Sequence, residues 1–183
     1  MTTTTKKTTS SKKPTTAAKK TTPSKTPAAK PVVEKIQLTP TSYVHEIFAA
    51  ISAERTKDKK IGILQQYNEN FIKSVLIWNF DESIQSDLPE GNVPLQENEN
   101  SSKSPSSNLR KEWSKLYNFV KGGNDAMNKL RKETMFINIL ESFHPGEAEV
   151  LILVKDKKLQ TKYNITKELV SEAYPDIQWG NRS

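Results

Sequence analysis

The sequence predicts an all-α domain of about seven helices that follows a disordered N-terminal tail. Apolar residues recur at helical spacing through most of residues 41–174, which predicts helices rather than strands. The first thirty residues contain eleven Thr and eight Lys, and no aromatic residue, Val, Ile or Leu. Such a segment has too little apolar surface to offset the entropy lost on ordering, so residues 1–35 are predicted to be disordered.

The positive charge of the 183-residue chain is concentrated in this tail. Residues 1–35 hold nine Lys and one acid, whereas residues 36–183 hold 19 basic and 20 acidic residues. Each lysine can neutralise a nucleic-acid phosphate and release a counterion, without reading sequence. The candidate phosphate-binding residues of the tail are Lys6, Lys7, Lys12, Lys13, Lys19, Lys20, Lys25 and Lys30. A tail that only keeps the protein soluble, or one that is a docking or phosphorylation segment, is the alternative.

Residues 36–96 are predicted to form an N-terminal helical lobe with three helices, within 41–54, 55–68 and 69–80. The first carries the i, i+3, i+4, i+7 apolar stripe of Val44, Ile47, Phe48 and Ile51. Thr41 or Ser42 is its expected N-cap, and Thr56 is the expected N-cap of the second helix. The third helix has so many apolar residues that we expect it to be central and buried.

The segment 81–96 interrupts the helical pattern and is expected to run extended along the domain, because Pro89, Gly91 and Pro94 favour turns. Its carboxylates have no metal-ligand spacing, so an acidic surface for a protein partner is the functional interpretation, and a plain solvated loop is the alternative. Residues 97–107 contain no large apolar side chain and are predicted to be a flexible loop between two lobes. The candidate partner-binding residues are Asp81, Glu82, Asp87 and Trp179.

Residues 108–183 are predicted to form the C-terminal helical lobe. A first helix, capped by Ser106 or Ser107 and ended by Gly122 and Gly123, places five apolar residues inward. A second helix, capped by Asn124 or Asp125, places another five inward. The two apolar sets are Leu109, Trp113, Leu116, Tyr117 and Val120, and then Leu130, Phe136, Ile137, Leu140 and Phe143.

Two further helices complete this lobe. Pro145 favours a helix start, and the run VLILV that follows is expected to be helical because no partner strand is visible. The last helix is expected to begin at Asn164 or Thr166 and to end before Pro175.

Parts of the C-terminal lobe resemble a known family. The stretches LYNFVKGGN at 116–124, LRKETMFINILESFHPGEAEVLILVKDKKL at 130–159 and ITKELVSEAYPDI at 165–177 are similar to an uncharacterised protein family of T-even-like tailed phages and cyanophages. FDESIQSDLPEGNVP at 80–94 resembles the middle of the same family. The resemblance covers about residues 42–177, excludes the tail, and brings no established activity. It implies a bacteriophage protein located in the host bacterial cytoplasm or in the virion.

Two lysine-rich clusters in the C-terminal lobe are further candidates. Lys129, Arg131 and Lys132 are predicted to assist nucleic-acid binding if they share a face with the second cluster. Surface charge at helix ends is the alternative for both clusters. The second cluster consists of Lys155, Lys157, Lys158 and Lys162.

Several classes of function have no support in the sequence. With no Cys and two His, the chain lacks the ligands of a Cys/His zinc site and a thiol nucleophile. It has no glycine-rich nucleotide loop, no nucleophile elbow and no apolar run that could span a membrane. We therefore expect a non-enzymatic accessory protein, without cofactor or small-molecule substrate, that associates with nucleic acid or a nucleoprotein complex. The alternative is a protein-interaction module, as a structural virion component or a modulator of a host protein.

Overall fold

The computed structural model describes residues 37–95 and 104–180, and the predicted tail and most of the predicted loop lie outside these ranges. The described residues contain helices and no named strand, so the all-α prediction is confirmed. A lone antiparallel bridge joins Ser86 to Val120. The helices are α1 (Val44–Ala53), α2 (Lys57–Gln66), α3 (Asn70–Phe80), α5 (Leu109–Glu112), the 3-10 helix η1 (Trp113–Phe119), α6 (Lys129–Ser142), α7 (Pro145–Lys155), α8 (Leu159–Tyr163) and α9 (Lys167–Ala173).

The first three helices form where the apolar stripes predict them. All four stripe residues of α1 are fully buried. The predicted N-cap of α1 is wrong, because the Ser42 hydroxyl accepts a hydrogen bond from the Thr39 backbone N–H instead. Tyr43 is the N-cap, and its backbone N–H donates to the Glu46 carboxylate at 2.9 Å. Thr56 is the N-cap of α2, as predicted.

The predicted helix over 108–121 is shorter and tighter than its spacing suggests. Only Leu109–Glu112 is α-helical, and the next seven residues form η1. Because a 3-10 helix has three residues per turn, the α-helical stripe does not stay on one face. Tyr117, predicted to face inward, is 54% exposed. The N-cap is Asn108, whose side chain accepts from the Lys111 N–H, rather than Ser106 or Ser107.

Helix α6 begins later than predicted. Its N-cap is Asn128, whose side chain accepts from the Arg131 N–H at 2.8 Å, so the predicted caps Asn124 and Asp125 are wrong. Leu130, predicted to be in the core, is 73% exposed, whereas Phe136 and Leu140 are buried as predicted.

The last helices follow the sequence closely. Pro145 is in the first turn of α7, and the run VLILV is helical. Of the two predicted caps for the last helix, Asn164 and Thr166, the structure has Thr166, whose side chain caps α9. Helix α8 was not predicted as a separate element. The Leu159 N–H at its start donates to the buried Asn79 side chain of α3 at 3.1 Å.

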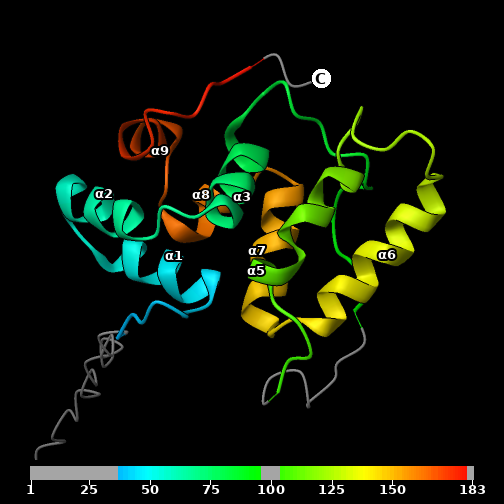
Figure 1. The fold of residues 1–183 in the computed structure, drawn as a ribbon, viewed down its shortest axis with the longest axis horizontal. Helices are drawn as coiled ribbons and strands as arrows, with labels where there is room; N and C mark the ends of the chain where they lie inside the picture. The colour runs from blue at the N-terminus through cyan, green and yellow to red at the C-terminus, as the bar shows by residue number, and fades with distance from the viewer. Residues whose placement is uncertain (1–36, 96–103, 181–183) are drawn as a thin grey trace, which may run out of the picture. The chain divides into compact units, whose positions relative to one another are not determined.

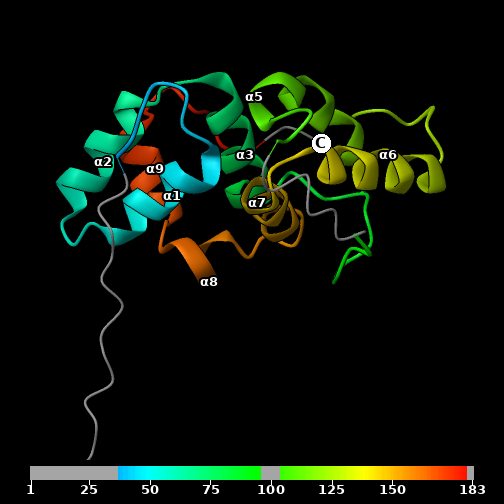
Figure 2. The same ribbon diagram turned by 90° about the horizontal axis from the view of Figure 1, so that it is seen from below.

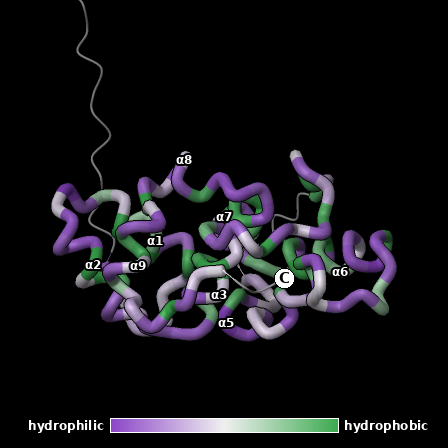
Figure 3. Tube along the Cα trace, turned by 90° about the horizontal axis from the view of Figure 1, so that it is seen from above, coloured by the Kyte–Doolittle hydropathy of each residue, from purple (hydrophilic) through white to green (hydrophobic). Residues whose placement is uncertain are grey.

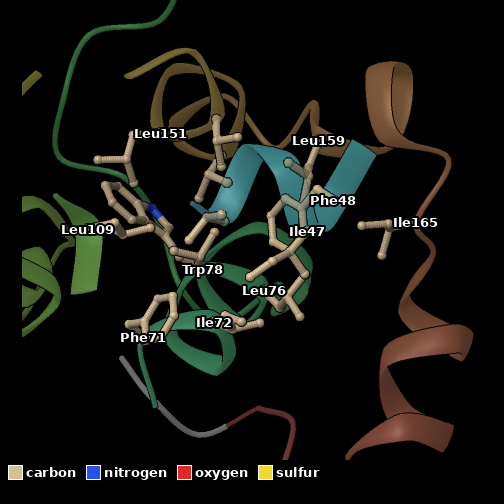
Figure 4. Close-up of a cluster of buried hydrophobic side chains, with 14 of the residues drawn as sticks. Ile47, Phe48, Phe71, Ile72, Leu76, Trp78, Leu109, Leu151, Leu159 and Ile165 are labelled. Atoms are coloured by element: carbon tan, nitrogen blue, oxygen red, sulfur yellow. The ribbon is translucent and has the colours of Figure 1, made fainter. Parts of the chain in front are cut away.

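Helices from both sides of the predicted loop share one hydrophobic core. In Figure 1, α2 and α9 lie together at one end and α6 lies at the other, with α7 between them. The view from below in Figure 2 shows the same neighbours. Helix α7 contacts α1, α3 and α6, so it is the central element. Figure 4 shows Ile47, Phe48 and Leu76 gathered with Leu159 in this core, and all four are fully buried.

Candidate functional site

Lys132 and Asp87, predicted to bind two different partners, bind each other inside the domain. The Lys132 side chain is 1% exposed, and its Nζ donates to Asp87 Oδ2 at 2.7 Å. The hydrogen bond from Lys132 lowers the pKa of Asp87. Neither side chain is therefore free on the surface, which removes Lys132 from the candidate phosphate contacts and Asp87 from the candidate partner contacts.

A signal in the sequence could have identified Lys132 as a buried residue. Lys132 precedes Phe136 by four residues and Leu140 by eight, so it lies on the helix face that those two residues bury. The sequence does not reveal its anion, because Asp87 is 45 residues away in an irregular segment.

Two more lysines hold the same extended segment. Lys155 is 3% exposed, and its Nζ donates to the backbone oxygens of Pro89 (2.8 Å) and Gly91 (3.1 Å) and to the neighbouring Asp156 carboxylate. Lys157 donates to the Asp81 backbone oxygen at 2.8 Å, and burial lowers its pKa.

We call Lys132, Lys155 and Lys157 the lysine clamp. The segment 81–91 has little regular structure to pair its carbonyl groups, and a buried ammonium group such as that of Lys132 or Lys155 needs oxygen acceptors. The clamp supplies ammonium donors to this segment. Two members of the second predicted lysine cluster thus have structural partners, while Lys158 and Lys162 are exposed.

The remaining candidate partner residues also differ from the predicted acidic surface. Asp81 is 1% exposed, and its carboxylate accepts from the Ser83 backbone N–H and hydroxyl and from the Gly180 N–H at 3.0 Å. Glu82 is exposed. Trp179 is half-buried against the core, and Lys167 Nζ lies 5.3 Å from the centroid of its ring.

In the first predicted lysine cluster, Lys129 and Arg131 keep exposed cationic side chains. Both lie in the first turn of α6, and neither forms an ion pair within residues 37–95 and 104–180. We call this pair the basic end of α6. The eight tail lysines lie outside the described residues.

Glu147 is a buried carboxylate whose role the sequence did not predict. It is 2% exposed in the first turn of α7, and its two oxygens accept from the Val44 N–H (3.1 Å) and the Leu109 N–H (3.0 Å). These are the first residues of α1 and α5, so one carboxylate accepts hydrogen bonds from otherwise unpaired N–H groups at the N-termini of two helices. Burial raises the pKa of Glu147 against the effect of these two hydrogen bonds.

The two histidines of the chain stack on each other at the N-terminus of α7, the helix that carries Glu147. The rings of His45 and His144 are parallel within 4°, with centroids 4.6 Å apart, and Tyr43 stacks on both. His144 Nδ1 accepts from the Gly146 N–H and so caps α7. Burial, and then the nearby His144, lower the pKa of His45. No local pattern in the sequence predicts this pair, because the two histidines are 99 residues apart.

Neither a cluster of metal ligands nor a membrane-spanning helix is found within the part of the chain that the structure describes. No three His, Asp or Glu side chains there are placed to share a metal ion. Among the same residues, every helix is too short or too polar to cross a bilayer.

Comparison with known proteins places the chain in a family but identifies no activity. No curated protein and no solved structure matches the sequence. The pattern of one protein family matches residues 47–161, from α1 to α8, which is more than half of the chain. The protein therefore belongs to the family of unknown function DUF6433.

Proposed function

We propose that this protein is a non-enzymatic accessory protein that associates with nucleic acid through phosphate contacts of its N-terminal lysines. The observation that carries the proposal is the separation of charge along the chain. Nine of its 28 basic residues fall in the first 35 positions, and the remaining 148 residues carry a formal charge of −1. The resemblance to a phage family supports a setting in an infected bacterium or in the virion.

The basic end of α6 is the second contact in this proposal. Lys129 and Arg131 are exposed on the same helical turn, where phosphate oxygens can reach them. Lys132 is left out because it is paired with Asp87. The contacts are with phosphate rather than with bases, so binding is expected to be nonspecific.

Binding to a protein through the acidic segment has less support as a function. Two of its four candidate residues, Asp81 and Asp87, hold contacts within the chain. This leaves Glu82 and the half-buried Trp179 as the accessible part of that surface.

Fluorescence anisotropy of a labelled 30-base-pair duplex tests the proposal. The full chain is compared with a variant in which the eight tail lysines, from Lys6 to Lys30, are replaced by glutamine. Six to ten phosphate contacts give a slope of log K against log salt of about −5 to −9. We expect the full chain to show a slope in this range and the variant to lose most of its affinity at 50 mM salt.

Two double variants make the result specific. Lys129→Gln with Arg131→Gln should weaken binding by a smaller factor than the tail variant does. Lys57→Gln with Lys59→Gln removes two exposed lysines of α2 and should leave binding unchanged. If the tail variant binds the duplex as tightly as the full chain, the proposed function is wrong.

A further inference from the structure

An open groove runs between η1 and α6, on the side of α6 away from the lysine clamp. Its volume is about 700 Å³, and its floor is mostly apolar. The α6 wall includes Met127, which precedes the helix, together with Met135 and Ile139, and the opposite wall includes Glu112 and Lys115. Figure 3 shows hydrophobic residues at the outer end of α6, and the highly exposed Leu130 belongs to that end.

The groove follows the axis of α6. Met127, Arg131, Met135, Asn138 and Ser142 line it at spacings of three or four residues, which is one face of a helix. The fourteen residues of α6 extend about 20 Å at 1.5 Å per residue. A second helix of about four turns matches this length.

Methionine is concentrated in this groove. The chain has three Met, and the two that follow Met1 both line it. Both side chains are half-buried. Because the thioether side chain is flexible and polarisable, methionine is favoured on surfaces that adapt to helical partners.

The charge along the groove indicates an acidic occupant. Glu112 is bound to Lys115, which lowers the pKa of Glu112, and it also accepts from Ser107. Arg131, which also lines the groove, forms no ion pair in the described residues. The uncompensated charge beside the apolar floor is therefore positive.

We infer that this groove binds an acidic amphipathic helix of a partner protein. The apolar face of that helix covers Met127, Met135 and Ile139, and its carboxylates pair with Arg131. The apolar floor favours a protein helix over a nucleic-acid duplex, whose accessible edge is phosphate. The inference does not depend on the proposed function of the tail.

Methyl NMR of the full chain, labelled with ¹³C at the methionine methyl groups, tests the inference directly. Three signals are expected, and two of them report on the groove. The probe is an 18-residue acetylated peptide with Leu at positions 1, 4, 5, 8, 11 and 12, Ala at positions 3, 7, 10 and 14, and Glu elsewhere. We expect the peptide to shift the Met127 and Met135 signals, with a Kd on the order of 10 µM, and to leave Met1 unchanged.

Charge reversal provides the matched control. Arg131→Glu should weaken peptide binding about tenfold, and it should not disturb folding because Glu is favourable in the first turn of a helix. Arg55→Glu reverses an exposed charge between α1 and α2, away from the groove, and should have no effect. The variant without tail lysines should bind the peptide normally even if it no longer binds DNA.

Three results would overturn the inference. The first is that the peptide shifts neither groove signal. The second is that the peptide shifts both signals as strongly with Arg131→Glu as with the unchanged protein, which would show that the occupant is not an acidic helix. The third is that dilution of the protein alone shifts these signals, which would identify a second copy of the chain as the occupant.

Discussion

Arg131 and Lys132 are adjacent in the first turn of α6, yet their side chains have opposite surroundings. Arg131 is exposed at the groove, whereas Lys132 is 1% exposed and paired with Asp87. Each residue of an α-helix is rotated by about 100° from the one before it, so one step moves a side chain from solvent to the core. Position on the helix, rather than the local density of charge, therefore decides which cations can meet a partner.

Buried and exposed charges also differ in how much they contribute to the free energy of unfolding. An exposed ion pair contributes about 0–1 kcal/mol. Removal of one member of a buried pair costs about 3–5 kcal/mol, because it leaves an uncompensated charge. Matched variants of one buried and one exposed charge in this domain therefore test the contrast.

The largest effect is expected for Glu147→Ala. This change leaves the buried N–H groups of Val44 and Leu109 without an acceptor. We expect a loss of about 3–4 kcal/mol in the free energy of unfolding. Urea unfolding followed by circular dichroism measures it.

Glu149→Ala is the control for that variant, because Glu149 lies two residues later in α7 and is exposed. It is expected to change stability by less than about 0.5 kcal/mol. Equal losses for the two variants would contradict the structural role of Glu147.

The next effect compares Lys132→Ala with Arg131→Ala. Lys132→Ala removes the partner of Asp87 and leaves a cavity, so we expect a loss of about 3 kcal/mol. Arg131→Ala should stay within about 0.5 kcal/mol of the unchanged protein. The same urea experiment measures both, and a similar loss for the two neighbours would break the comparison on which the clamp is based.

The smallest effect is expected from the stacked histidines. Burial and His144 lower the pKa of His45 below its ordinary 6.5, against the influence of Glu46 and Glu149 and together with that of Lys162. The unfolded chain therefore binds a proton more readily, so His45 contributes stability above pH 6.5 that is lost as pH falls below it.

Urea midpoints at pH 7.5 and 5.5 measure this contribution. His45→Phe keeps a flat ring in the stack and cannot take up a proton, so its midpoint should fall less over this range. An equal fall in the two proteins would show that His45 does not contribute to the pH dependence.

The sequence predicted the regular parts of the fold well. The stripe from Val44 to Ile51 and the proline at the start of α7 depend on local spacing, and both predictions are confirmed. The region 108–121 was less predictable, because η1 turns Tyr117 outward although its spacing fits an α-helix.

The candidate site could be predicted only in part, because its contacts join distant segments. Lys155 meets Pro89 and Gly91 across more than sixty residues, and Glu147 meets Val44 across 103. One sequence contains no signal for such pairs. The local charge pattern therefore predicts a separate acidic surface and basic surface. In the structure, residues of the two predicted surfaces contact each other instead.

The close approach of Gly146 to His45 links two positions that lie far apart in the sequence. A Cβ atom at residue 146 would lie 2.5 Å from His45 Cδ2, so a side chain there would require the His45 ring, which stacks on Tyr43 and on His144, to shift. Substitution at one position is thus constrained by the residue at the other. Relatives that acquire a side chain at 146 should carry a smaller residue at 45, so the two positions are expected to covary during evolution.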